Sequence, residues 1–210
     1  LKINYQPDTI KFDWLDDIWA AWGPQGLVAF AFFAMSTFAV QIRSKQKSLG
    51  FLEITGEGGS GKTTLIEALW RAFGRFEHEG IDPNKGSIPY LARSMMGVSN
   101  LPVGLVEGNR EDDKKNHNKK FDWNELLTLF NGRNPRGTAL KTSGNEISEP
   151  PFLGSIYLMQ NDPISAIPPV LERCMSMVIS KADWTEKTGE AAVRMESMPM
   201  EEMSGTIVHI

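Results

Sequence analysis

The feature that most constrains the fold is residues 50–73, where a short apolar run, a glycine-rich turn and a helical pattern follow one another directly. Residues 50–55 have the length and apolar character of a buried strand. Residues 62–73 are rich in Leu, Ile and Ala, which favour a helix. The turn between them reads GEGGSGKT, and we call residues 56–63 the glycine-rich loop. A strand, a glycine turn and a helix in this order predict an α/β fold.

The glycine-rich loop has the P-loop pattern, which indicates phosphate binding. Its glycines let the backbone curl so that successive N–H groups face an anion, and the following helix N-terminus adds a partial positive charge. Lys62 is expected to reach the β- and γ-phosphates, and Thr63 to offer its hydroxyl to Mg²⁺. A chance glycine turn is the other interpretation, disfavoured by the strand before and the helix after. We predict that ATP or a related nucleotide binds, with Mg²⁺, at these residues: Gly56, Glu57, Gly58, Gly59, Ser60, Gly61, Lys62, Thr63 and Thr64.

Further apolar runs at residues 101–106, 152–159 and 175–179 are interpreted as strands. Helical patterns lie between the predicted strands at 90–96, 122–130 and 165–173, and a further one follows them at 185–198. Strands that alternate with helices predict a three-layer αβα fold with a mostly parallel central sheet.

The N-terminal part is predicted to be helical, with a break at Gly23-Pro24 between helices at 14–22 and 25–45. We therefore expect a helical lead-in over residues 1–48, packed on an ATPase domain over residues 49–210. The chain starts at Leu1 and ends in an apolar run, so we interpret it as a segment of a longer protein.

The apolar stretch at residues 26–40 raises the question of a membrane span. It is shorter than the roughly 20 residues that cross a bilayer, and Pro24 and Arg43 bound it. We expect a buried helix and no membrane association. Cys174 is the one cysteine, which excludes an internal disulfide framework and fits the reducing cytoplasm.

Three polar residues beyond the loop are candidates for catalysis. Glu107 follows a predicted strand and could orient the metal or water, with Asp112 and Asp113 as substitutes and a surface carboxylate as the alternative. Asn161 follows another strand and could hold the attacking water, or else cap the next helix. Arg173 has a guanidinium fork that suits a γ-phosphate, or it is a cation at a helix C-terminus.

Two basic groups are candidates for nucleic-acid contact, because the formal net charge of −4 leaves only local patches for that role. One is the lysine run of residues 114–120, for which a solvated loop is favoured. The other surrounds a hairpin predicted at residues 137–148, where positive charges could follow a phosphate backbone. This second group consists of Arg133, Arg136 and Lys141.

These motifs, taken in order, resemble the helicase-type ATPase region of mobile-element and phage primase-helicases, which often carry a TOPRIM primase domain. The resemblance covers most of residues 14–210. It is carried by TGEGGSGKTTLIE at 55–67, EGIDP at 79–83, SNLP at 99–102 leading to Glu107, FDWNEL at 121–126 with FNGR at 130–133, EPPF at 149–152 leading to Gln160-Asn161, and the late Arg173 and Met198-Pro199.

The order is also similar to that of superfamily three helicases, in which a basic hairpin lines a ring channel. The resemblance implies ATP-driven unwinding of single-stranded or forked DNA by a homo-oligomeric ring, commonly a hexamer. It also implies that Arg173 acts across a subunit boundary. Glu107 is followed by Gly108, whereas the family usually has an acidic pair there.

The first functional hypothesis is therefore the ATP-hydrolysing motor domain of a DNA replication primase-helicase, located in the cytoplasm. The second is a nucleotide-switched ATPase that loads or anchors a replication partner without unwinding. A small-molecule kinase is the third. It is disfavoured by the predicted order of helix, hairpin and strand between Glu107 and Asn161, where a kinase would normally carry a lid rich in arginine.

Overall fold

The computed structural model describes residues 11–76, 78, 80–85, 87–106, 121–133, 138–139, 147–148 and 150–205. Three predicted site residues, Glu107, Arg136 and Lys141, lie outside these ranges.

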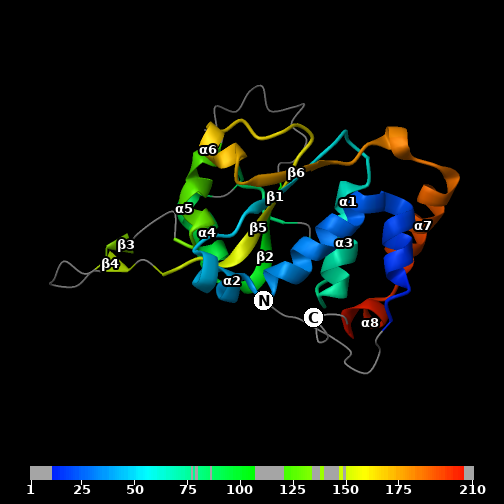
Figure 1. The fold of residues 1–210 in the computed structure, drawn as a ribbon, viewed down its shortest axis with the longest axis horizontal. Helices are drawn as coiled ribbons and strands as arrows, with labels where there is room; N and C mark the ends of the chain where they lie inside the picture. The colour runs from blue at the N-terminus through cyan, green and yellow to red at the C-terminus, as the bar shows by residue number, and fades with distance from the viewer. Residues whose placement is uncertain are drawn as a thin grey trace.

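A four-stranded parallel sheet forms the centre of the molecule (Figure 1). Its strands are β1 (Phe51–Thr55), β2 (Ser99–Val106), β5 (Leu153–Met159) and β6 (Cys174–Val178), in the spatial order β2-β5-β1-β6. Each was predicted from its apolar run. Since all four are parallel, their carboxyl ends meet at one edge, and the glycine-rich loop leaves β1 at that edge.

Helices cover both faces of the sheet, which confirms the predicted three layers (Figure 1). Alternation along β1 divides the core, because Leu52 and Ile54 face one side and Phe51 the other. The first side packs against α1 (Trp14–Ser36), α3 (Lys62–Ala72), α7 (Glu186–Ser197) and α8 (Met200–Met203). The second packs against α4 (Ile88–Met96), η2 (Trp123–Glu125), α5 (Leu126–Phe130) and α6 (Pro168–Leu171).

The N-terminal helices differ from the prediction in where they break. Gly23 has non-helical backbone angles of φ 56° and ψ −142°, so the expected break is a kink inside α1. The predicted helix 25–45 is instead divided, because α1 ends at Ser36 and α2 (Ala39–Gln46) starts three residues later. Thr37 donates its hydroxyl to the Ala34 carbonyl oxygen at 2.6 Å, and such bonds compete with helix continuation.

The helix predicted at 165–173 is reduced to α6, four residues long. Two prolines at its start lack the N–H groups that an earlier turn would need, so the helix cannot begin at residue 165.

Helix α1 is long and apolar enough to cross a membrane, judged by length and composition alone. Here it belongs to the core: Phe33 is fully buried, with its ring centroid 5.3 Å from that of Trp70 and 5.5 Å from that of Tyr157. The expected packing of this apolar stretch on the sheet is therefore observed.

We expect Arg43→Ala to lower the free energy of unfolding by about 3 kcal/mol, because it would remove buried charge-assisted hydrogen bonds to carbonyl oxygens and leave a cavity in place of the side chain. Arg43 is 8% exposed and donates to the Gly154 oxygen at 2.5 Å and the Leu129 oxygen at 3.4 Å, which ties α2 to β5 and α5. Burial lowers its pKa to about 10. Urea unfolding measures the effect. Arg93→Ala, at an exposed position on α4, is the control and should change the free energy by less than about 0.5 kcal/mol. Equal losses in the two variants would contradict this role of Arg43.

Candidate functional site

The glycine-rich loop curls between β1 and α3 with positive φ angles at Gly56, Gly59 and Gly61, of 145°, 73° and 88°. A Cβ atom on Gly56 would lie 2.0 Å from the Ile179 carbonyl oxygen, which excludes a side chain there. One on Gly61 would lie 3.1 Å from Nε1 of Trp22, which is a tight contact. The loop therefore needs glycine at Gly56 for close packing, and at both positions for the backbone conformation.

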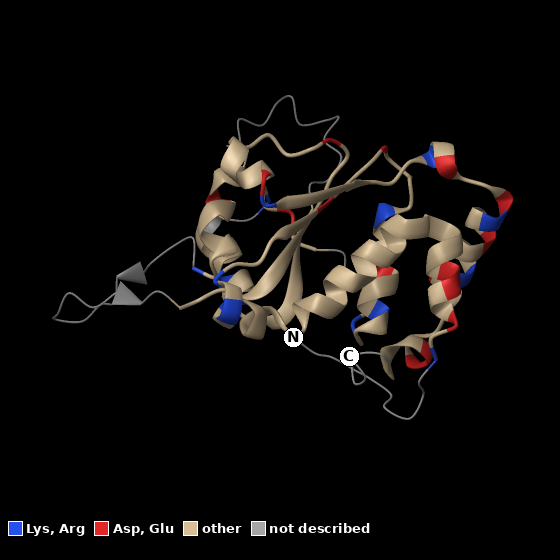
Figure 2. Cartoon of the chain, viewed as in Figure 1, with Lys and Arg blue, Asp and Glu red and all other residues tan. Residues whose placement is uncertain are grey.

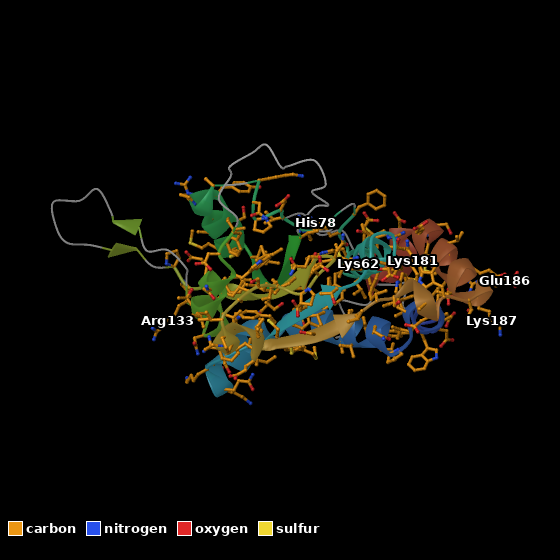
Figure 3. All side chains as sticks on the ribbon, turned by 90° about the horizontal axis from the view of Figure 1, so that it is seen from above. Lys62, His78, Arg133, Lys181, Glu186 and Lys187 are labelled. Atoms are coloured by element: carbon orange, nitrogen blue, oxygen red, sulfur yellow. The ribbon has the colours of Figure 1, made fainter. Side chains whose placement is uncertain are left out.

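Lys62 is the first residue of α3, and its side chain turns back over the loop (Figure 3). Its Nζ donates to the carbonyl oxygens of Gly56 at 2.5 Å and Glu57 at 3.0 Å. It also donates to Oδ1 of Asn161 at 3.2 Å, although Asn161 is 99 residues away along the chain. Lys62 and Asn161, which were proposed separately from the sequence, are thus joined by a hydrogen bond.

Asn161 follows β5, and its backbone oxygen accepts from the Gly56 N–H at 3.2 Å. The neighbouring Gln160 is 7% exposed, and its Nε2 is a buried donor with no partner in the described part of the chain. The end of β5 therefore presents two side-chain amides beside Lys62.

A cavity of about 460 Å³ lies beside the loop. Residues 58–64 line it, together with the strand ends at Val106 and at 159–161. The remaining lining residues come from α1, α7 and the turn before α7. They are Ala21, Trp22, Trp184, Thr188, Gly189, Ala192 and Glu196.

Lys181 is a second cation at the loop and was not proposed from the sequence (Figure 3). Its backbone N–H donates to Oε1 of Glu57 at 2.6 Å, and this bond holds the pKa of the Glu57 carboxyl below its usual value. A Cβ atom on Gly59 would lie 3.1 Å from its Nζ, so the ammonium lies against the loop. Burial lowers the pKa of Lys62, and Lys181 lowers it further, against an opposite effect of Glu57. The sequence does show a lysine two residues after the strand predicted at 175–179. Its role at the loop could not be inferred from that position alone, because it depends on β6 lying next to β1.

The predicted metal ligands are described only in part. Thr63 is exposed and lines the cavity, whereas Thr64 donates its hydroxyl to Oε1 of Glu196 on α7 at 3.0 Å. Glu107 lies outside the described residues, although β2 ends beside the cavity at Val106. The described ranges hold no group of three or more His, Cys, Asp or Glu residues suited to a metal. P-loop enzymes hold Mg²⁺ with a Ser or Thr hydroxyl of the loop and one acidic residue, and Thr63 has the hydroxyl at that position.

Arg173 lies at the opposite end of the sheet from the loop. Its backbone oxygen accepts from the N–H of Phe51, the first residue of β1, whereas the loop follows the last residue of that strand. Its guanidinium donates to the Leu127 oxygen at 3.1 Å and lies 4.4 Å from the ring centroid of Phe130. The strand between them spans roughly 16 Å at 3.3 Å per residue, so Arg173 cannot serve the loop of its own chain.

The predicted hairpin is present as a separate two-stranded antiparallel sheet, β3 (Thr138–Ala139) with β4 (Ile147–Ser148). Arg133 is exposed just after α5, on the hairpin side of the molecule (Figure 3). Its predicted partners Arg136 and Lys141 lie outside the described residues.

No protein-family model matches this chain, and no curated protein matches it either. Solved structures do resemble it. An active helicase, Cch of SCCmec type IV, superimposes with a TM-score of 0.52 at 13% identity, over 93% of this chain and 36% of that one. The JCV helicase, solved with a bound acetamide compound, superimposes with a TM-score of 0.54 at 14% identity, over 93% of this chain and 52% of that one.

This chain therefore has the fold of a helicase-type domain, as its motifs predicted. It spans between about a third and a half of the length of these helicases.

Proposed function

We propose that this chain is the ATP-binding and ATP-hydrolysing motor domain of a DNA replication primase-helicase, and that hydrolysis drives translocation on DNA or its unwinding. The observation that carries the proposal is the Lys62 ammonium, held by loop carbonyl oxygens and by Asn161 at the edge of the cavity. The helicase-type fold supports the same conclusion.

In this mechanism the loop N–H groups bind the phosphates of ATP, and Lys62 exchanges its loop contacts for oxygens of the β- and γ-phosphates. Asn161, released from Lys62, orients the attacking water. Thr63 would hold Mg²⁺, which would neutralise phosphate charge, and Glu107 would orient the metal or the water. Lys181 adds positive charge beside the loop, as its contact with Gly59 suggests.

The proposed partner is single-stranded or forked DNA, contacted by Arg133, Arg136 and Lys141 around the hairpin. We also propose that the domain works as a homo-oligomeric ring in the cytoplasm, without a membrane. A primase domain in the full-length chain, of a mobile genetic element, completes this proposal.

The test is ATP hydrolysis with and without single-stranded DNA, followed by strand separation on a forked duplex. A motor domain should hydrolyse ATP faster with DNA and separate the strands. Weak stimulation without strand separation would favour a nucleotide-switched loader instead. Turnover that DNA does not change, but that a small phosphoryl acceptor does, would overturn both.

Arg133→Ala should weaken single-stranded DNA binding several-fold, because one phosphate contact is lost, and lower the salt slope of log K by roughly 0.7. ATP affinity without DNA should stay the same. Lys187→Ala is the matched control, since that exposed lysine lies on α7, away from Arg133, among interleaved acidic and basic residues (Figures 2 and 3). If Arg133→Ala lowers ATP affinity and leaves DNA binding intact, the residue does not belong to a DNA surface.

A further inference from the structure

Two tryptophans lie against Gly61 of the loop, and one of them is buried whereas the other is exposed. Trp22 is 7% exposed and donates from Nε1 to the Gly61 oxygen at 3.2 Å. A Cβ atom on Gly61 would lie 3.8 Å from Cζ2 of Trp184, which is 47% exposed. Trp22 thus supports the loop, while Trp184 keeps much of its indole surface accessible beside the cavity.

The backbone around Trp184 is held from both sides. Its N–H donates to the Lys181 oxygen at 3.1 Å, which closes the η3 turn (Lys181–Asp183). The next residue, Thr185, caps α7 and forms a capping box with Thr188. An aromatic ring on such a fixed segment can bind a flat partner with little loss of conformational freedom.

The lining of the cavity offers both polar and apolar groups. The loop, Lys62, Gln160 and Asn161 supply hydrogen-bond donors. Trp184 and small residues of α1 and α7 supply apolar surface, next to the polar Thr188 and Glu196. A Cβ atom on Gly189 would meet no atom within 4 Å, so α7 leaves open space there. A nucleotide needs both kinds of group, since it joins a charged phosphate chain to a flat, uncharged base.

We propose that Trp184 stacks on the base of the bound nucleotide and that this contact favours purine over pyrimidine nucleotides. This rests on the proposed nucleotide site and goes beyond it, since that proposal assigns residues to the phosphates and the metal but none to the base. Purines have two fused rings and therefore overlap an indole more fully than pyrimidines do.

The experiment measures the dissociation constants of ATP, CTP and inorganic tripolyphosphate by calorimetry. Trp184→Ala should weaken ATP binding by roughly tenfold, which lies within the range for loss of one stacked base. Tripolyphosphate has no base, so its affinity should not change. The preference of the wild type for ATP over CTP should shrink, and Trp184→Phe should recover much of it.

Trp19→Ala is the matched control, because Trp19 is also exposed, at 55%, but lines a neighbouring hollow and not the cavity at the loop. Unchanged ATP affinity in Trp184→Ala would overturn the proposal. An equal loss for ATP and tripolyphosphate would also overturn it, since Trp184 would then only support the loop. If Lys62→Ala binds both ligands like the wild type, or the wild type binds neither, the nucleotide site itself fails.

Discussion

Replacing Lys62 with alanine should lower ATP affinity by at least about a hundredfold, because charge-assisted hydrogen bonds each contribute about 1.5–3 kcal/mol and Lys62 can offer several. The fold should persist, since among the described residues the ammonium bonds to the loop and to Asn161 at the edge of the cavity, and not to the core. The carbonyl oxygens that it leaves can bond to water there. Calorimetry with ATP and thermal melting should be measured on the same preparation.

Lys187→Ala serves as the control for charge, because Lys187 is exposed on α7 and does not line the cavity. It should bind ATP like the wild type. If Lys62→Ala hydrolyses ATP at the wild-type rate, the glycine-rich loop is not a nucleotide site and the proposed function is wrong.

Replacing Arg173 with alanine should lower ATP hydrolysis by about 10³-fold while ATP affinity stays near the wild-type value. That is the range expected when a neighbouring subunit supplies an arginine to the transition state. Arg173 lies at the far end of β1 from the loop, so a direct contact with the transition state has to come from the Arg173 of another subunit.

A mixing experiment separates this role from a structural one. Combine Arg173→Ala chains, which keep Lys62, with Lys62→Ala chains, which keep Arg173. In a randomly mixed ring about a quarter of the interfaces would join an intact Lys62 site to an intact Arg173, so part of the activity should return.

The structural alternative predicts a different result. Arg173 donates to the Leu127 oxygen and stacks on Phe130, so its loss could loosen α5 and lower the melting temperature. Normal hydrolysis by Arg173→Ala, or inactive mixtures in which mixed rings demonstrably form, would leave Arg173 as a structural cation only.

The sequence by itself was sufficient for those features that depend on near neighbours in the chain. Four apolar runs predicted the four strands of the sheet, and the glycine pattern predicted the loop between β1 and α3. The start of α7 was also predicted, and Thr185 caps it locally. The helix predicted at 165–173 is present but shorter, because the two prolines within the range prevent an earlier start.

Only the tertiary structure decided which distant residues meet at the loop. The strand order places β5 and β6 on either side of β1, so the residues that follow those strands meet the loop. Asn161 thereby reaches Lys62, and Lys181 reaches Glu57 across 124 residues of sequence. Strand order depends on how whole helices and strands pack, and no local pattern records that packing.

The packing of whole helices and strands also decides where Trp184 and Arg173 lie relative to the loop. Trp184 lies against Gly61 because α7 packs on α1 and α3. Arg173 precedes β6 and therefore lies at the end of the sheet away from the loop, whereas Lys181 follows β6 and lies at the loop. Sequence patterns thus predicted the four strands of the sheet, most of the helices and the position of the loop. The parallel order of the strands decided at which end of the sheet each polar side chain lies. It thereby decided which of these side chains share one cavity.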